Sequence, residues 1–467
     1  MKDSFQGLLP LRAQRDYRLL WSARTVSITG SEVSKLAVPL TAITMLAASP
    51  LEMGLLTAAA SVPALLFGLH AGAIADRLRR HRPTMIACEL VSAAAALTVP
   101  LAWMLGVLTV AWLLAVALVI GTAAVLFRAV NFPYVASIVA PDQRTAAMAG
   151  FNASYSVASV AGPGLAGALV QVLTAPLAVL AEGVSFLVSA LLLRTIRTPE
   201  HRTPAPSRGL WRDVAEGLRV CVSQPVLRAL LGAGVTINFF ATAYLAVWML
   251  YMLHDLGIPA NAIALLIALG GAGGILGALV TPRLAKRYGE NKVLLGAVLF
   301  FPVEILAVGL VEGPLWWRIA VLAIAGLGAG AVVVAFASCL SGIVMRDTPS
   351  ALRGRVNSTL TFGTQGVMAV GGIAGGAAAE MMGLRAVILL CAAGIATAIL
   401  WIWVSPLRPG FSGSRTGPSG GAVPSSDAAS PDDVAPSGSA ALPDRASVPL
   451  RSTAAEERMI TRRQPFV

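Results

Sequence analysis

The chain has 467 residues, of which 56% are hydrophobic and 12% are charged, and its mean hydropathy is +0.76. Soluble domains carry about 25% charged residues, so this composition excludes an ordinary soluble protein and indicates that lipid surrounds most of the chain. The net charge of +12 comes from basic residues grouped in short segments between apolar runs. This distribution argues against a nucleic-acid partner.

Twelve apolar segments follow one another along the chain, with lengths suited to crossing the ~30 Å hydrocarbon core as helices. Runs of this length without strict alternation favour helices over a β-barrel, and a helix satisfies its own backbone hydrogen bonds in lipid. We therefore predict an all-α membrane protein with twelve transmembrane helices. The expected spans are residues 19–47, 51–75, 84–105, 108–138, 146–174, 176–194, 227–253, 261–281, 291–311, 315–345, 355–383 and 384–405.

These spans form two sets of six, separated by a basic, proline-containing segment. Arginines gather on one side, in the loops of that side and near the N-terminus at Arg12, Arg15, Arg18 and Arg24. The positive-inside rule therefore places both termini and the central loop in the cytoplasm. The final segment is rich in Ser, Pro and Gly and cannot bury enough apolar surface to fold, so we predict a disordered tail. The expected parts are a cytoplasmic N-terminus over 1–18, an N-terminal six-helix half over 19–194, a central loop over 195–226, a C-terminal half over 227–405 and a cytoplasmic tail over 406–467. The first residues lack a small-residue cleavage site, so no removable signal peptide is expected.

The cysteines and histidines are too scattered to predict a metal site or a disulfide framework, and no phosphate-binding loop indicates ATP as an energy source. No nucleophile, base and orienting group stand at usable spacing. The sequence therefore predicts a protein that is not an enzyme and that uses no cofactor.

The segment between the second and third spans, residues 72–83, joins a glycine, an aspartate and a cluster of arginines. It resembles the signature loop of the major facilitator superfamily, in which glycine is followed four residues later by aspartate, then arginine and a basic cluster. The matching residues are Gly72, Asp76, Arg77 and Arg80, while Arg79 stands where the family usually has glycine. The resemblance covers residues 10–405 and implies two pseudo-symmetric six-helix halves, with the substrate site at their interface near the membrane midplane.

The resemblance also implies that Asp76 is part of a latch that secures the cytoplasmic side of the two halves. A carboxylate there can accept hydrogen bonds from a helix N-terminus, each contributing ~0.3–1 kcal/mol. Arg355, before the eleventh span, is the expected partner, and Arg128 in the fourth span could belong to the same latch. An ordinary positive-inside loop is the alternative, which explains the arginines but not the glycine-to-aspartate spacing. Residues 277–287 resemble a worn copy of this segment, with Thr281 at the aspartate position.

The fifth span contains a second motif, formed by Gly162, Pro163 and Gly167. It is similar to the Gly-Pro motif of the superfamily's drug/proton antiporters, where glycines let helices approach closely and proline bends the helix. Simple helix packing is the alternative. Residues 15–21 are similar to the opening of bacterial exporters for macrolides, siderophores and related metabolites, so the chain most resembles this subgroup.

Ionisable groups inside spans cost roughly 2.5–3.5 kcal/mol on insertion scales, so each is a functional candidate. Glu32 is the first candidate for proton coupling, because the first helix lines the central cavity in the family, and Glu182 is the second. Lys35 lies one turn from Glu32, so a fixed structural ion pair is an alternative role for both. The other ionisable residues expected within spans are Glu89, Arg128 and Glu304.

The expected cavity has few charges, which suits an amphipathic organic compound better than a sugar or a phosphate. Its candidate lining residues are Lys35, Asn131, Tyr155, Asn238, Tyr244, Trp248 and Gln365. We expect a monomer in the bacterial cell membrane that uses a proton gradient to export a drug, antibiotic or secondary metabolite. Its expected partners are this small molecule and the lipid bilayer, with no nucleic acid. An uptake permease on the same fold and a membrane sensor or scaffold that has lost transport are the alternatives.

Overall fold

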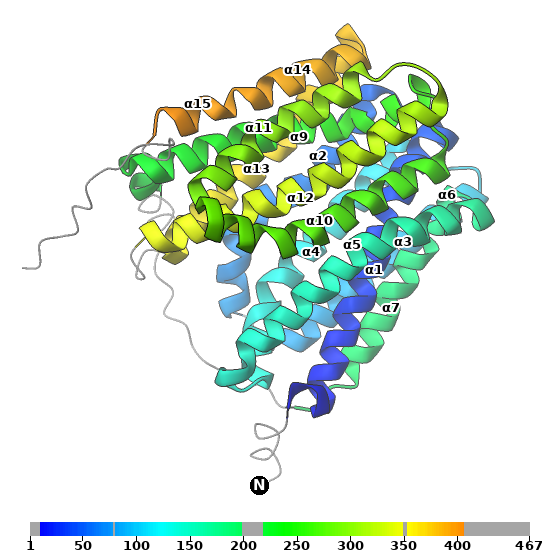
Figure 1. Ribbon diagram of the computed structural model, residues 1–467. Coiled ribbons are helices and arrows are strands. Elements are labelled where there is room, and N and C mark those ends of the chain that lie inside the picture. Colours follow the sequence, from blue (N-terminus) through cyan, green and yellow to red (C-terminus); the bar gives the residue numbers. More distant parts are fainter. Residues whose placement is uncertain (1–9, 78–79, 199–217, 349–352, 406–467) are drawn as a thin grey trace, which may run out of the picture. The chain divides into compact units, whose positions relative to one another are not determined.

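Nearly all described residues of the computed structural model lie in helices (Figure 1), and the description covers residues 10–77, 80–198, 218–348 and 353–405. The N-terminal half contains α1 (Arg15–Leu46), α2 (Pro50–Arg77), α3 (His81–Met104), α4 (Val110–Ile138), α5 (Arg144–Leu173), α6 (Ala175–Ala178) and α7 (Leu180–Arg194). The C-terminal half contains α9 (Pro225–His254), α10 (Ala260–Tyr288), α11 (Glu290–Leu310), α12 (Leu315–Asp347), α13 (Arg353–Met382), α14 (Leu384–Ala396) and α15 (Ala398–Trp403). Short 3-10 turns at Leu11–Ala13 and Pro141–Gln143 precede α1 and α5.

Each of the twelve expected spans is occupied by one helix or by two consecutive helices, which confirms the all-α membrane fold. Among the described residues, ten segments are long and apolar enough to cross a membrane. The two long helices outside this set are α1 and α13, with 32 and 30 residues. α1 packs against α5 and α7, and α13 packs against α2 and α9. Because their neighbours are protein on several sides, these two helices can carry polar residues that lipid-facing helices exclude.

The connection between the second and third spans is shorter than the expected one, residues 76–83. α2 continues without interruption through Gly72 to Arg77, and α3 begins at His81. The expected second span, 51–75, therefore lies within α2, and only the last two residues of α2, which were expected in the loop, belong to the helix instead. The reason is that alanine and isoleucine at 73–75 sustain a helix, and nothing before Arg77 ends it.

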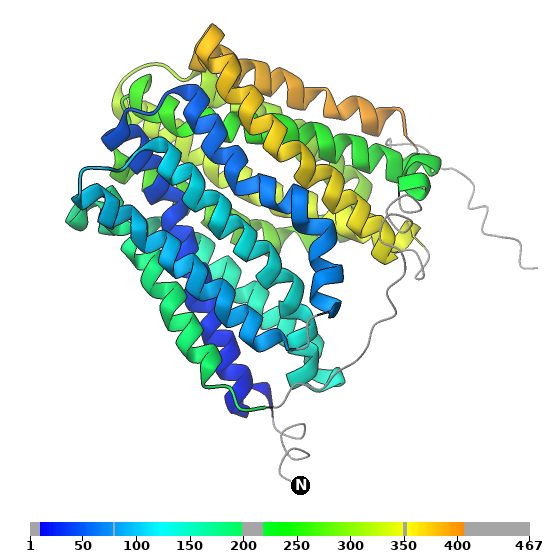
Figure 2. The same cartoon turned by 180° about the vertical axis from the view of Figure 1, so that it is seen from behind.

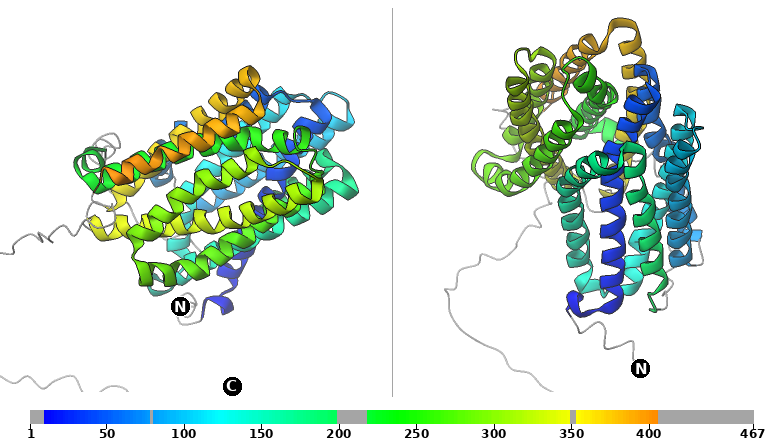
Figure 3. Two further views of the ribbon diagram at one scale, coloured as in Figure 1. Left: turned by 45° about the horizontal axis from the view of Figure 1, so that its top comes forward. Right: turned by 90° about the vertical axis from the view of Figure 1, so that its right-hand side faces the viewer.

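Helix α1 stands between α5 and α7, as the right-hand view of Figure 3 shows. Along α1 and α5 the contacting residues keep a nearly constant offset, so the two helices run parallel. The Tyr17 hydroxyl donates to the carbonyl of Ala147 at 3.4 Å, and the Thr25 hydroxyl donates to Ser154 Oγ at 2.9 Å. These hydrogen bonds fix the register of α1 on α5 and so determine which of its side chains face the interior.

The two halves meet along α2 with α13 and along α5 with α10. Figure 2 shows α2 and α13 lying side by side. We call the end of the bundle at which α1 begins the N-terminal end, and the opposite end the far end. Gly54, near the start of α2, lies so close to α13 that an added Cβ atom would be 2.5 Å from the carbonyl oxygen of Gly372 and 2.9 Å from Gly376 Cα. The backbones of the two halves are therefore in direct contact near the far end.

Candidate functional site

A cavity of about 1170 Å³ lies between the two halves, and residues of both halves line it. Most of its lining is apolar, and its aromatic members include Phe127, Tyr155, Tyr244 and Trp248. The charged side chains of the lining are Arg24, Glu32, Lys35, Glu89, Arg128, Glu182 and Glu304. A cavity of this size can hold a drug-sized molecule, and its few charges determine which molecules it can hold.

Glu32 and Lys35 form an ion pair on the wall made by α1. Lys35 Nζ lies 2.6 Å from Glu32 Oε1, and the Lys35 ammonium lies 5.8 Å from the centre of the Tyr155 ring on α5. Glu32 is 7% exposed, whereas the Lys35 side chain is 61% exposed to the cavity. The ion pair that the sequence offered as an alternative is thus present. The Glu32 carboxylate is buried, and the Lys35 ammonium is exposed to the cavity.

The glycines of the fifth span lie at two close helix contacts. A Cβ atom at Gly162 would be 2.4 Å from Glu32 Cβ, so α5 packs closely against α1 beside the ion pair. A Cβ atom at Gly167 would be 2.6 Å from Ala264 Cβ on α10, which belongs to the other half. Pro163 is buried between these contacts, and α5 remains one helix across it. These positions require small residues because a side chain would overlap atoms that are already there.

Glu182 lies near the start of α7 and is 5% exposed. Ser31 and Ser34 on α1 lie close to its carboxylate. Neither an ion pair nor a nearby basic group is found for Glu182 within the described ranges. It therefore differs from Glu32, whose charge Lys35 compensates.

Glu89 on α3 faces the same side of α1, closer to the N-terminal end. Ser27 Oγ donates to Glu89 Oε1 at 3.2 Å, and the Arg24 guanidinium lies nearby and 5.0 Å from the centre of the Phe127 ring. The sequence prediction included Glu89 among the ionisable residues but missed Arg24, which it assigned to the basic residues of the N-terminus. The spacing of Arg24 and Ser27, one helical turn apart, could have placed both on one face of α1.

The wall made by the C-terminal half carries Glu304 on α11 and Tyr244 and Trp248 on α9. Tyr244 is buried, and Glu304 is near enough to interact electrostatically with it. Trp248 lies one helical turn beyond Tyr244, so both side chains face the same side of α9. Across the described part of the chain, Glu304 has neither a hydrogen bond nor an ion pair.

Three of the seven candidate lining residues lie outside the cavity lining, while Lys35, Tyr155, Tyr244 and Trp248 belong to it. Asn131 is buried within α4, where its Oδ1 atom has no hydrogen-bond partner among the described residues. Asn238 Nδ2 donates to the carbonyl of Gly234 on its own helix at 2.8 Å. Gln365 is half-buried on α13 and is likewise outside the lining. These three residues do not line the cavity in this structure, because polarity identifies an interior residue but not the face of the helix on which it lies.

The structure does not describe the surroundings of most residues expected to form the latch. These residues are Gly72, Asp76, Arg77 and Arg355. Arg80 is exposed and directly precedes α3. Arg128 is exposed in the cavity and lies near Arg24, so it contributes positive charge to the cavity itself.

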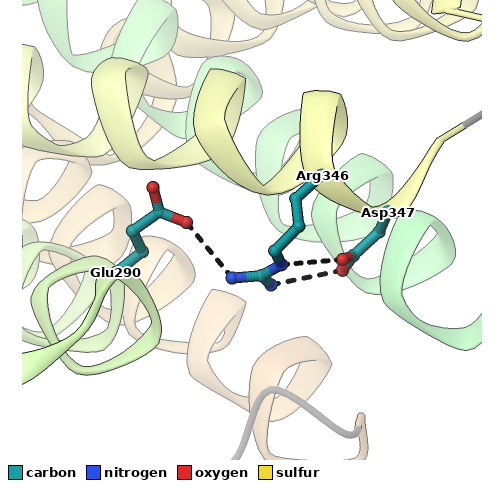
Figure 4. A network of polar contacts seen from close by, with 3 residues as sticks. All are labelled: Glu290, Arg346 and Asp347. Atoms are coloured by element: carbon teal, nitrogen blue, oxygen red, sulfur yellow. Dashed lines mark hydrogen bonds and ion pairs between the residues drawn. The ribbon is translucent and has the colours of Figure 1, made fainter. Parts of the chain in front are cut away.

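A network of charged groups joins two helices of the C-terminal half at the N-terminal end (Figure 4). Arg346, at the end of α12, places Nη1 3.2 Å from Glu290 Oε2 and Nε 2.8 Å from Asp347 Oδ1. Glu290 is the first residue of α11 and follows the segment that resembles a copy of residues 72–82. The network thus ties the start of α11 to the end of α12 at the position that corresponds to the α2–α3 connection.

Comparisons with known structures agree with this geometry. The chain is similar to a nucleoside transporter, NupG (D323A mutant), with 13% identity and a TM-score of 0.67 over 83% of this chain and 99% of that one. It is also similar to a bacterial homologue of the iron transporter ferroportin. The inward-facing state of that homologue has 16% identity and a TM-score of 0.65, over 83% of this chain and 99% of that one. Its outward-facing state, with soaked iron, has 17% identity and a TM-score of 0.55, over 83% of this chain and 98% of that one. These likenesses show the fold of a major facilitator transporter.

No curated protein sequence matches the chain. The model of one protein family, described as transmembrane secretion effector, matches residues 6–416. This match covers nearly all of the helical part of the chain and agrees with the transporter fold of the solved structures. The chain therefore belongs to the transmembrane secretion effector family, and it is a multi-pass membrane transporter of the major facilitator fold.

Proposed function

We propose that this transporter is a proton-coupled exporter of an amphipathic organic compound. The observation that carries the proposal is the large, mostly apolar cavity between the halves, whose charged groups are few and partly paired with one another. A sugar or a phosphate would need many more hydrogen-bond donors or basic groups on such a wall. The solved structures include transporters of nucleosides and of iron, so the fold alone does not select the substrate.

The contacts between the halves support an alternating-access mechanism. The halves touch through backbone atoms near the far end, at Gly54 with Gly372 and Gly376. The positive-inside rule places the N-terminal end in the cytoplasm and the far end outside the cell. The TM-score is higher with the inward-facing state of the ferroportin homologue than with its outward-facing state. This difference supports a conformation closed at the outer side. This conformation corresponds to a transporter closed to the outside of a bacterial cell membrane, with both termini cytoplasmic.

Two buried carboxylates of the N-terminal half are candidates for proton binding. Protonating Glu32 would remove its ion pair with Lys35, which lies at 2.6 Å. Protonating Glu182 would break no ion pair, because its neighbours are the hydroxyls of Ser31 and Ser34. We therefore place Glu182 first as the residue that binds and releases the proton. Glu32 and Lys35 lie on α1 together with Ser31 and Ser34, so a shift of α1 on protonation of Glu182 would also move this ion pair.

The test is uphill flux of a labelled amphipathic compound in proteoliposomes with an imposed pH gradient. Glu182→Gln should abolish accumulation driven by the gradient while downhill exchange of the compound persists, because only the coupling step is lost. Glu312→Gln, at an exposed residue on the α11–α12 connection, is the matched control and should behave as the wild type. Accumulation by Glu182→Gln at the wild-type level would reject Glu182 as the coupling residue, and Glu32→Gln would be examined next.

The direction of transport is a separate question with its own measurement. Inverted and right-side-out vesicles, energised identically, distinguish an exporter from an uptake permease on the same fold. Export predicts accumulation in inverted vesicles, and uptake predicts accumulation in right-side-out vesicles. No flux of any kind in either preparation would favour a sensor or scaffold.

A further inference from the structure

Among the described residues that line the cavity from the C-terminal half, Glu304 on α11 is the one charged group, and Tyr244 and Trp248 on α9 belong to the same lining. We propose that Glu304, Tyr244 and Trp248 form a subsite that binds the positively charged group of an organic cation, such as a tertiary or quaternary amine. The proposal rests on the proposed function only in taking this cavity as the substrate site. It requires neither a direction of transport nor coupling to protons.

The distribution of charge around the cavity is the first support. The lining contains four carboxylates and three basic side chains, and all three basic side chains belong to the N-terminal half. There, Glu32 is paired with Lys35, and Glu89 has Arg24 nearby. Among the lining residues of the C-terminal half, Glu304 has no opposite charge to compensate it. The half of the cavity that faces α9 and α11 is therefore selectively attractive to a cation.

The isolation of Glu304 is the second support. A carboxylate placed among apolar residues is costly unless an opposite charge or hydrogen bonds compensate it. Its lining neighbours on α11 are Phe301, Ile305 and Val308, and none of these can compensate a charge. A bound cation would supply the missing partner.

The two aromatic residues determine the kind of cation. Tyr244 and Trp248 lie one turn apart on α9 and both line the cavity. Aromatic rings attract organic cations through the negative face of the ring, and tryptophan does so most strongly. A small inorganic cation keeps its water and gains little from such rings, whereas an alkylammonium or arylphosphonium group also buries its apolar substituents against the apolar wall. Carboxylate and rings together therefore favour a bulky organic cation.

Equilibrium dialysis of the purified full-length protein against two probes of similar shape tests this subsite. The probes are tetraphenylphosphonium, a permanent cation, and triphenylphosphine oxide, which is neutral. Glu304→Gln should weaken the binding of the cation about tenfold, equivalent to ~1.4 kcal/mol, and change the binding of the neutral probe less than twofold. Glu312→Gln removes an exposed carboxylate outside the cavity and should leave both affinities unchanged.

A wild-type protein that does not bind the cation, or a Glu304→Gln variant that binds it with unchanged affinity, would overturn the proposal. Trp248→Leu provides an independent variant if Glu304→Gln does not fold. It removes a ring without changing a charge, and it should weaken binding of the cation more than binding of the neutral probe, whereas equal losses would also overturn the subsite. No gradient is present in these measurements, so cation binding can be found even if proton-driven export fails. Conversely, loss of cation binding would overturn the subsite but not export of a neutral compound.

Discussion

Gly54→Ala is predicted to open the transporter at the far end. The added Cβ atom would lie 2.5 Å from the carbonyl oxygen of Gly372, whereas ordinary van der Waals contacts begin at 3.4 Å. The neighbouring atoms are backbone atoms of α13, so no side chain can rotate away, and the two helices must separate by roughly 1 Å. The substitution therefore acts directly on the contact between the halves.

Overpacking of this kind costs about 1–3 kcal/mol. The cost falls on the conformation in which α2 and α13 touch and not on one in which they have separated. A free-energy change of this size shifts a two-state equilibrium about 5- to 150-fold. The population open at the far end should rise by that factor, and gradient-driven turnover should fall because the cycle no longer returns readily to the closed state.

Labelling of a cysteine inside the cavity measures this population. Ser61 lines the cavity from α2, and Ser61→Cys is introduced after the four buried native cysteines have been replaced by alanine. A membrane-impermeant maleimide added on the far side should label this cysteine about 5- to 150-fold faster with Gly54→Ala present. Gly164→Ala is the control, because nothing lies within 4 Å of a Cβ atom at that position. An unchanged labelling rate in a folded Gly54→Ala protein would refute the reasoning.

Three further predictions concern single substitutions elsewhere in the chain. Gly162→Leu should impair substrate exchange, because even a Cβ atom there would lie 2.4 Å from Glu32 Cβ; exchange at the wild-type rate in vesicles would contradict the close packing of α1 on α5. Asp76→Asn should leave the amount of protein in the membrane unchanged and slow transport severely, since a neutral amide loses charge-assisted hydrogen bonds, and normal flux at normal abundance would argue against the latch. Arg346→Ala should lower the free energy of unfolding by only about 0–1 kcal/mol, because Arg346 is exposed and its partners Glu290 and Asp347 are partly exposed; a larger loss in a thermal unfolding assay would show that the network is more important than its exposure indicates.

The sequence was sufficient to predict the helices but not the orientation of every polar side chain. Apolar run length determines where a chain can cross lipid, so the expected spans coincide with helices within a few residues. The spacing of Glu32 and Lys35 also allowed their ion pair to be anticipated. By contrast, Asn131 and Tyr155 were equally good cavity candidates, and only Tyr155 lines the cavity. The rotation of α4 and α5 against their neighbours depends on contacts from distant parts of the chain, which local pattern does not contain.

The isolation of Glu304 could not be predicted for the same reason. The sequence identifies a carboxylate in the ninth span, but whether a described basic residue lies near it depends on what α9 and α12 bring to the same wall. Arg24 is the opposite case, since it looked like one of the basic residues that mark a cytoplasmic end and instead lines the cavity. The sequence does not decide whether a charge near the end of a helix lies in the cavity or in the loop. A helix of 32 residues extends beyond the hydrocarbon core, so a basic group near its end can lie inside or outside that core.

The contacts of α5 make it a mechanical connection between the two halves. At Gly162 its backbone rests on Glu32, and five residues further along, at Gly167, it rests on Ala264 of α10. A helix is stiff over so short a distance, and neither contact leaves room for compression. A shift of α1 toward α5 at the ion pair would therefore press α5 toward α10 of the other half. The ion pair on α1 and the contact with the other half are thus separated by less than two helical turns of α5.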